Sequence, residues 1–135
     1  LDCIISCVMT AFKMNDGMIN FENIQTTAYF YNECFELLFK YFNYYEINYH
    51  TVKYENVITN FKYEISNLLK FLNLNYQENI NNFQETAKLR KKINTPSYDQ
   101  VTQPLYSSSI NRYKNFEEIK NIKVDIKRWL NEFSY

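Results

Sequence analysis

The chain has 135 residues, of which 46% are hydrophobic and 22% charged, so it has the size of one compact domain and the composition of a globular protein. Fifteen basic and fifteen acidic residues cancel to a formal net charge of zero. No global field is therefore present to hold a nucleic acid or an anionic membrane, and any anion must be bound by local groups.

Two helices are expected in the first third of the chain. The stretch from Cys3 to Lys13 is predicted to be a buried helix that ends close to Gly17. A longer helix is predicted from Ile24 to Phe42, with Thr26 or Thr27 as its N-cap. One apolar face of that helix is expected to carry Tyr31, Phe35, Leu38 and Phe42.

The segment INYHTVKYENVI, residues 47–58, begins with the alternating pattern of a β-strand. A lone apolar strand cannot bury both of its faces, so it requires further strands from elsewhere. The abrupt apolar start at Leu1 agrees with this expectation, because it suggests a chain cut from a longer protein. The opening run IISCVMTAF has no basic leader and is too short to span a bilayer, so a cytoplasmic protein is expected.

The second half is predicted to be helical around one long polar segment. Asn60 is expected to cap a helix over 61–74, in which Asn73 adopts the left-handed conformation. A short helix is predicted over 78–86, and an amphipathic helix over 115–133. The inward face of that last helix is predicted to carry Ile119, Ile122, Ile126, Trp129, Leu130 and Phe133. Between them, 96–113 contains both prolines and is expected to stay unhelical.

Cysteine and histidine provide no familiar metal or disulfide framework. The cysteines number three, at Cys3, Cys7 and Cys34, and His50 is the single histidine, which we interpret as structural. No metal site is therefore predicted. Cys3 and Cys7 are spaced to share a helix face, and we interpret them as buried reduced thiols.

Four dispersed residues have side chains suited to a nucleotide. Ser6 is expected early in the first helix, where free backbone N–H groups favour an anion. Tyr54 is expected at the end of the strand, where its ring could stack on a base. Ser97 and Arg112 flank the polar segment, and an Arg guanidinium can clamp a phosphate with two hydrogen bonds. Each of these residues has an ordinary structural interpretation as well.

Several stretches occur together in an order that is typical of one enzyme family. They are LDCIISC at the start, VKYENVI, ISNLLKFLNL, SYDQVTQPLYSSSINRY and the terminal WLNEFSY. In this succession the chain resembles the C-terminal part of the sulfotransferases that use 3'-phosphoadenosine 5'-phosphosulfate (PAPS). The nearest branch is the tyrosylprotein-sulfotransferase-like enzymes, which in bacteria are often fused to upstream tetratricopeptide repeats.

The resemblance implies an α/β fold, a P-loop-NTPase-like parallel sheet flanked by helices. Residues 1–135 would be its mostly helical C-terminal portion with about one strand. The intact enzyme would transfer a sulfuryl group from PAPS to an acceptor hydroxyl, on a protein tyrosine, a carbohydrate or a small metabolite. The phosphosulfate loop and the general base would lie upstream of Leu1, so the fragment alone is expected to be inactive.

By position, the resemblance assigns Ser6 to the 3'-phosphate and Tyr54 to the adenosine end, with Ser97 and Arg112 closing the cofactor cleft. It gives Glu55 the role of a brace for the neighbouring loop. The chain departs from the family at Thr10, where the branch often has a basic residue. A non-catalytic helical interaction module is the alternative function, and a nucleotide kinase of related architecture is a third.

Overall fold

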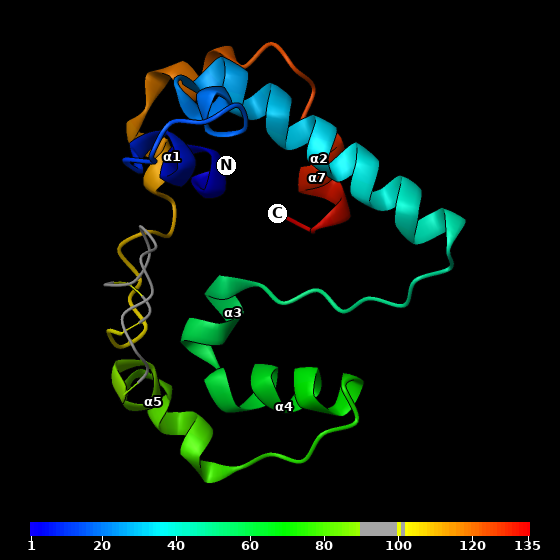
Figure 1. Cartoon of the computed structure of the whole chain (residues 1–135), viewed down its shortest axis with the longest axis vertical. Helices are drawn as coiled ribbons and strands as arrows, with labels where there is room; N and C mark the ends of the chain where they lie inside the picture. The colour runs from blue at the N-terminus through cyan, green and yellow to red at the C-terminus, as the bar shows by residue number, and fades with distance from the viewer. Residues whose placement is uncertain (90–99, 101) are drawn as a thin grey trace. The chain divides into compact units, whose positions relative to one another are not determined.

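The structure is a computed structural model that describes residues 1–89, 100 and 102–135 (Figure 1). The elements in these residues are α-helices and 3-10 helices, and no β-strand occurs among them. They form two compact units. Unit 1 comprises Leu1–Tyr49 and Ser109–Tyr135, and unit 2 comprises His50–Ser108.

The predicted α/β fold is wrong, because the described part of the chain is all-helical. The expected strand is irregular over 47–53, and α3 (Tyr54–Thr59) begins where the strand should have continued. Side chains over 47–52 are exposed on both sides, and the described residues offer no second strand to pair with them. Without a partner for its backbone groups, an alternating pattern cannot become a strand.

α1 (Asp2–Met9) opens unit 1 and ends four residues before the predicted Lys13. Thr10 takes extended dihedrals, and its hydroxyl donates to the Ser6 carbonyl at 2.6 Å, a bond that competes with the helical backbone. The Asn15 side chain then accepts from the backbone N–H groups of Gly17 and Met18. This turn leads into the 3-10 helix η1 (Met18–Phe21).

α2 (Ile24–Tyr44) confirms the longest predicted helix, although its cap differs. The cap is Asn23, whose side chain accepts from the Thr26 N–H at 3.0 Å, while Thr26 and Thr27 lie inside the first turn. Neither α2 nor any other helix of the described residues combines the length and the apolar character needed to cross a membrane.

The core of unit 1 is aromatic and joins α2 to the end of the chain. Trp129 is 1% exposed, and its ring centroid lies 5.5 Å from Phe35 and 5.3 Å from Phe39. Its indole N–H donates to the Asn32 Oδ1 atom at 2.9 Å, so burial leaves no unpaired donor. The other buried members of this cluster are Ile4, Ala28, Phe39 and Ile126.

The predicted continuous helix over 115–133 is wrong, because two short pieces occupy this range, η4 (Glu117–Asn121) and α7 (Lys127–Glu132). A further 3-10 helix, η3 (Arg112–Asn115), ends where the predicted helix should begin. Ahead of α7, the Asp125 carboxylate accepts from the Lys127 N–H at 2.9 Å, a local bond that favours a turn over a continuous helix. The inward residues are nevertheless largely confirmed, since Ile126 and Trp129 are buried and Ile119, Ile122 and Phe133 pack against them.

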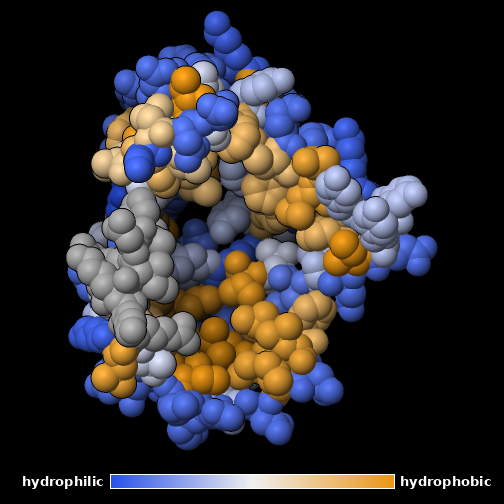
Figure 2. Space-filling view, in the orientation of Figure 1, coloured by the Kyte–Doolittle hydropathy of each residue, from blue (hydrophilic) through white to orange (hydrophobic). Residues whose placement is uncertain are grey.

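Unit 2 contains α3, α4 (Phe61–Phe71), η2 (Glu78–Asn82) and α5 (Phe83–Leu89). Asn60 is the N-cap residue of α4 as predicted, although its side chain makes no capping hydrogen bond. No residue of α4 is buried, and apolar side chains gather on the surface over α3 and α4 (Figure 2). The short helix predicted over 78–86 is confirmed as the η2 and α5 pair.

Three helices end in the same way, with a left-handed residue that is not glycine. Asn73 has a φ of 55° after α4, as predicted, and Glu46 and Ser134 have φ values of 50° and 55° after α2 and α7. Behind Asn73, the Leu74 N–H donates to the Leu69 carbonyl, the long hydrogen bond of a Schellman motif.

We expect Trp129→Ala to destabilise unit 1 by about 3–5 kcal/mol, because it removes a fully buried indole and leaves a cavity. Denaturant unfolding followed by circular dichroism measures the loss. Tyr44→Ala is the matched control, since that ring is 80% exposed. Equal unfolding midpoints for the two variants would show that Trp129 does not hold the core.

Candidate functional site

The candidate site is centred on the Asp2 carboxylate, which holds the segment that carries Arg112. One oxygen accepts from the Asn111 N–H at 2.7 Å, and the other accepts from the Tyr113 N–H at 2.8 Å. η3 packs against α1 as a result. Asn111 takes the left-handed conformation, with a φ of 60°, at the start of η3. The first and last parts of unit 1 therefore meet at one junction, which we call the Asp2 junction.

Ser6 lies on the same face of α1 as Asp2, one helical turn further along. Its side chain is exposed, and its hydroxyl has no hydrogen-bond partner among the described residues. The expectation that it sits among free backbone N–H groups is wrong. α1 begins at Asp2, so Ser6 is its fifth residue and lies beyond the first turn. Ser6 can still offer its hydroxyl as a donor.

Arg112 is half-exposed and forms the first residue of η3. Within the part of the chain that the structure describes, its guanidinium has no hydrogen-bond or ion-pair partner. Asp2 accepts hydrogen bonds from the backbone on either side of Arg112, so the Arg112 side chain extends from a segment of backbone that is held in place. A guanidinium in this state is free to take a phosphate by two charge-assisted hydrogen bonds.

Tyr54 belongs to unit 2 and is the first residue of α3, not the end of a strand. Its hydroxyl donates to the Tyr106 carbonyl at 3.0 Å, and the two rings meet edge to face with centroids 6.2 Å apart. Tyr106 lies in the polar segment, so Tyr54 contacts one residue of that segment within unit 2. The Tyr54 ring remains 37% exposed, which leaves part of its surface open to a ligand.

Of the predicted site residues, the structure brings Ser6 and Arg112 into one unit, through the packing of α1 on η3. Tyr54 lies in the other unit. Ser97 lies outside the described residues. Asp2 was not among the predicted site residues. Its position did offer a signal, because an acidic side chain in the first turn of a helix often accepts hydrogen bonds from backbone N–H groups.

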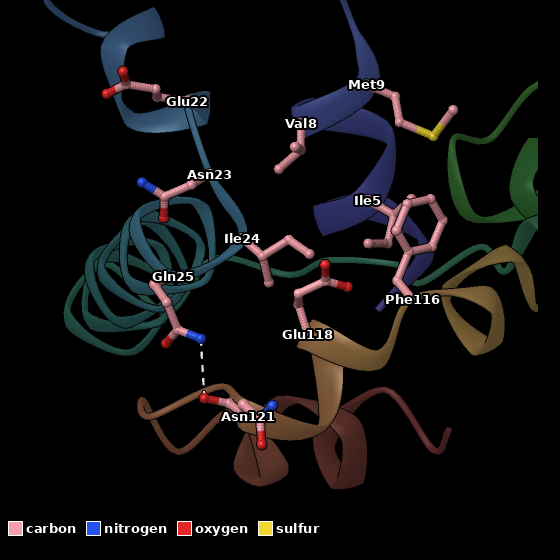
Figure 3. A pocket seen from close by; sticks show the side chains of 10 residues that line it. All are labelled: Ile5, Val8, Met9, Glu22, Asn23, Ile24, Gln25, Phe116, Glu118 and Asn121. Atoms are coloured by element: carbon pink, nitrogen blue, oxygen red, sulfur yellow. Dashed lines mark hydrogen bonds between the residues drawn. The ribbon is translucent and has the colours of Figure 1, made fainter.

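A groove of about 610 Å³ lies in unit 1 among α1, the start of α2 and η4 (Figure 3). Its walls are largely apolar, and Glu118 and Ile24 project toward its centre. Gln25 closes one end, where its amide donates to the Asn121 carbonyl at 2.9 Å. Its lining residues are Ile5, Val8, Met9, Glu22, Asn23, Ile24, Gln25, Phe116, Glu118 and Asn121. Of the predicted site residues that the structure describes, Ser6, Tyr54 and Arg112 do not line it.

The thiols of α1 differ from their predicted state. Cys3 is exposed and Cys7 is partly exposed, so the expectation of two buried thiols is wrong. The neighbouring Cys7 thiol lowers the pKa of Cys3 to about 6, against the opposing effect of burial. Among the described residues, no group of three or more His, Cys, Asp or Glu side chains is arranged to bind a metal ion.

Comparison with protein-family models, curated proteins and solved structures finds no match to this chain. The function of the chain is therefore inferred from its own residues and contacts.

We expect Asp2→Ala to release η3 from α1, because two backbone N–H groups lose a charged acceptor worth about 1–2 kcal/mol in all. Amide hydrogen exchange at Asn111 and Tyr113 should then be about tenfold faster, since 1.4 kcal/mol is a factor of ten. Asp16→Ala is the control, because Asp16 is an exposed acidic residue of the same unit. Unchanged exchange at both amides would contradict the Asp2 junction.

Proposed function

We propose that this chain is the nucleotide-binding part of a cytoplasmic PAPS-dependent sulfotransferase, and that the Asp2 junction binds the 3'-phosphate of the donor. The observation that supports the proposal is a contact between two of the segments on which the resemblance depends. LDCIISC and SINRY are far apart in the sequence, and the Asp2 carboxylate joins them by accepting two backbone hydrogen bonds.

The chemistry of the junction suits a phosphate dianion. Ser6 offers a hydroxyl donor and Arg112 offers a guanidinium, and neither side chain is engaged within the described residues. Asp2 carries a negative charge nearby, but its two oxygens accept from Asn111 and Tyr113. In a protein of zero net charge, such local donors are the means of holding a phosphate.

The resemblance also implies that Tyr54 contacts the adenosine end and that Ser97 borders the cleft, and both assignments stay predictions because Tyr54 belongs to unit 2 and Ser97 lies outside the described residues. The partly exposed Tyr54 ring offers a surface on which a base can stack. When bound, PAPS would supply the sulfuryl group that passes to an acceptor hydroxyl. The role of this chain would be to hold the nucleotide in position for an in-line displacement, a role in which positioning and charge matter most.

The test is a thermal shift of the full-length protein with 3'-phosphoadenosine 5'-phosphate. We expect the nucleotide to raise the Tm, and Arg112→Ala and Ser6→Ala each to weaken binding about tenfold or more, because each removes a phosphate donor. Lys114→Ala controls for charge in the same 3-10 helix, and Ser66→Ala controls for the loss of a helical serine hydroxyl.

An equal response in Arg112→Ala and in the unaltered protein would refute the assignment of the phosphate to the Asp2 junction. A stronger loss in Lys114→Ala would have the same meaning. A competing measurement with adenosine 5'-monophosphate addresses the 3'-phosphate itself, since binding through that group predicts clearly weaker affinity for the nucleotide that lacks it.

A second function, a non-catalytic helical interaction module, is favoured by the all-helical fold and by an exposed aromatic surface at the end of α2. Tyr41 and Tyr45 stack with centroids 6.0 Å apart, and Tyr44 meets Tyr45 edge to face. Aromatic side chains exposed in this way are common in protein interfaces. Cooperative unfolding of the chain as a stable monomer, with no response to the nucleotide, would support this function over the enzyme.

A further inference from the structure

The groove of unit 1 combines apolar walls with acidic side chains (Figure 3). Its volume of about 610 Å³ lies within the range of about 300–1,000 Å³ that is usual for sites of small organic molecules. The charged side chains of its lining are Glu22 and Glu118, and none of the described residues that line it is basic. Its apolar walls are formed by Ile5, Val8, Met9, Ile24 and Phe116.

Glu118 is the carboxylate that projects toward the centre of the groove (Figure 3). Its neighbour Glu117 is already occupied, because the Lys120 Nζ atom donates to both of its oxygens, at 2.9 and 2.8 Å. Among the described residues, Glu118 has no hydrogen bond or ion pair of this kind. Its side chain is exposed, so a cation from solution can reach it.

The groove is held in shape by hydrogen bonds at one end. The Gln25 amide donates to the Asn121 carbonyl at 2.9 Å and accepts from the Lys123 N–H at 3.1 Å, which ties the start of α2 to the segment after η4. The Asn23 side chain is engaged as the N-cap of α2, where it accepts from the Thr26 N–H. Because these contacts exist without a ligand, little ordering of the protein is needed for binding.

We propose that this groove binds a small organic cation, an ammonium compound with an apolar body. The apolar body lies against the walls from α1, α2 and Phe116, and the ammonium group forms a charge-assisted hydrogen bond with Glu118. The Phe116 ring favours a cation as well, because the face of an aromatic ring attracts an ammonium group. An anion of the same shape would meet the like charge of Glu118, and a neutral analogue would gain the apolar contacts alone.

The first test compares three probes of one chain length, n-octylamine, n-octanol and octanoate, at concentrations below those at which they aggregate. Isothermal titration calorimetry of the full chain at pH 7 measures their affinities. We expect the amine to bind about tenfold more tightly than the alcohol, and octanoate to bind least, because the ammonium group alone can pair with Glu118. Equal affinities for the amine and the carboxylate would overturn the proposal. This test does not involve the nucleotide proposed above.

A second test removes the charge of Glu118. Glu118→Gln should weaken the binding of n-octylamine about tenfold and leave that of n-octanol unchanged, because only the amine uses the carboxylate. Glu117→Gln is the matched control, since Glu117 precedes it in η4, pairs with Lys120 and does not line the groove. Binding of the amine that is unchanged in Glu118→Gln, or weakened equally in both variants, would refute the site.

A third test supplies the cation from the chain itself. Met9→Lys places an ammonium group at the wall of the groove, so the binding of n-octylamine should fall at least tenfold through repulsion and competition for Glu118. Met14→Lys is the control for charge, because Met14 is similarly exposed, at 61% against 57% for Met9, and does not line the groove. Equal losses in the two variants would mean a general charge effect and would contradict the proposal.

Discussion

The burial of Trp129 is the constraint on which unit 1 depends. The indole can enter an apolar core because Asn32 accepts its N–H, and it contacts the rings of Phe35 and Phe39 on α2. The Arg128 guanidinium lies over the same indole, 4.6 Å from its ring centroid, and forms an ion pair with Glu36. One side chain of the short helix α7 thus brings the end of the chain onto α2, and α7 alone has too few residues to be stable without that contact.

Elements with strong helical periodicity were predictable, whereas the predicted strand is absent from the described residues. The length of α2 and the left-handed Asn73 follow from local pattern and local chemistry, and both are as expected. The expected strand over 47–58 failed because alternation specifies a strand only where a partner supplies hydrogen bonds, a condition that no local pattern can express. The long C-terminal helix failed because Asp125 competes for the backbone locally, although the apolar spacing still placed Ile126 and Trp129 in the core.

The candidate site was predictable only as residue types. Ser6 and Arg112 were chosen for donor chemistry, and their meeting in one unit depends on Asp2, whose partners lie 109 and 111 residues away. The spacing of neighbouring residues cannot predict a contact between residues so far apart in the sequence. The exposure of Cys3 was missed for a related reason, since the pattern of α1 shows that Cys3 and Cys7 share a face but does not show what covers that face.

The left-handed helix ends have a consequence for how the protein folds. The chain has one glycine, and Glu46, Asn73 and Ser134 occupy the positions where glycine would end a helix at little cost. Apart from Asn, such residues resist this conformation by about 1–2 kcal/mol, so an isolated α2 or α7 has little intrinsic tendency to stop there. Packing of flanking side chains helps to fix these ends, as Tyr49 does on Phe42 beyond the end of α2. Helix boundaries in this protein therefore depend on tertiary contacts as well as on local hydrogen bonds.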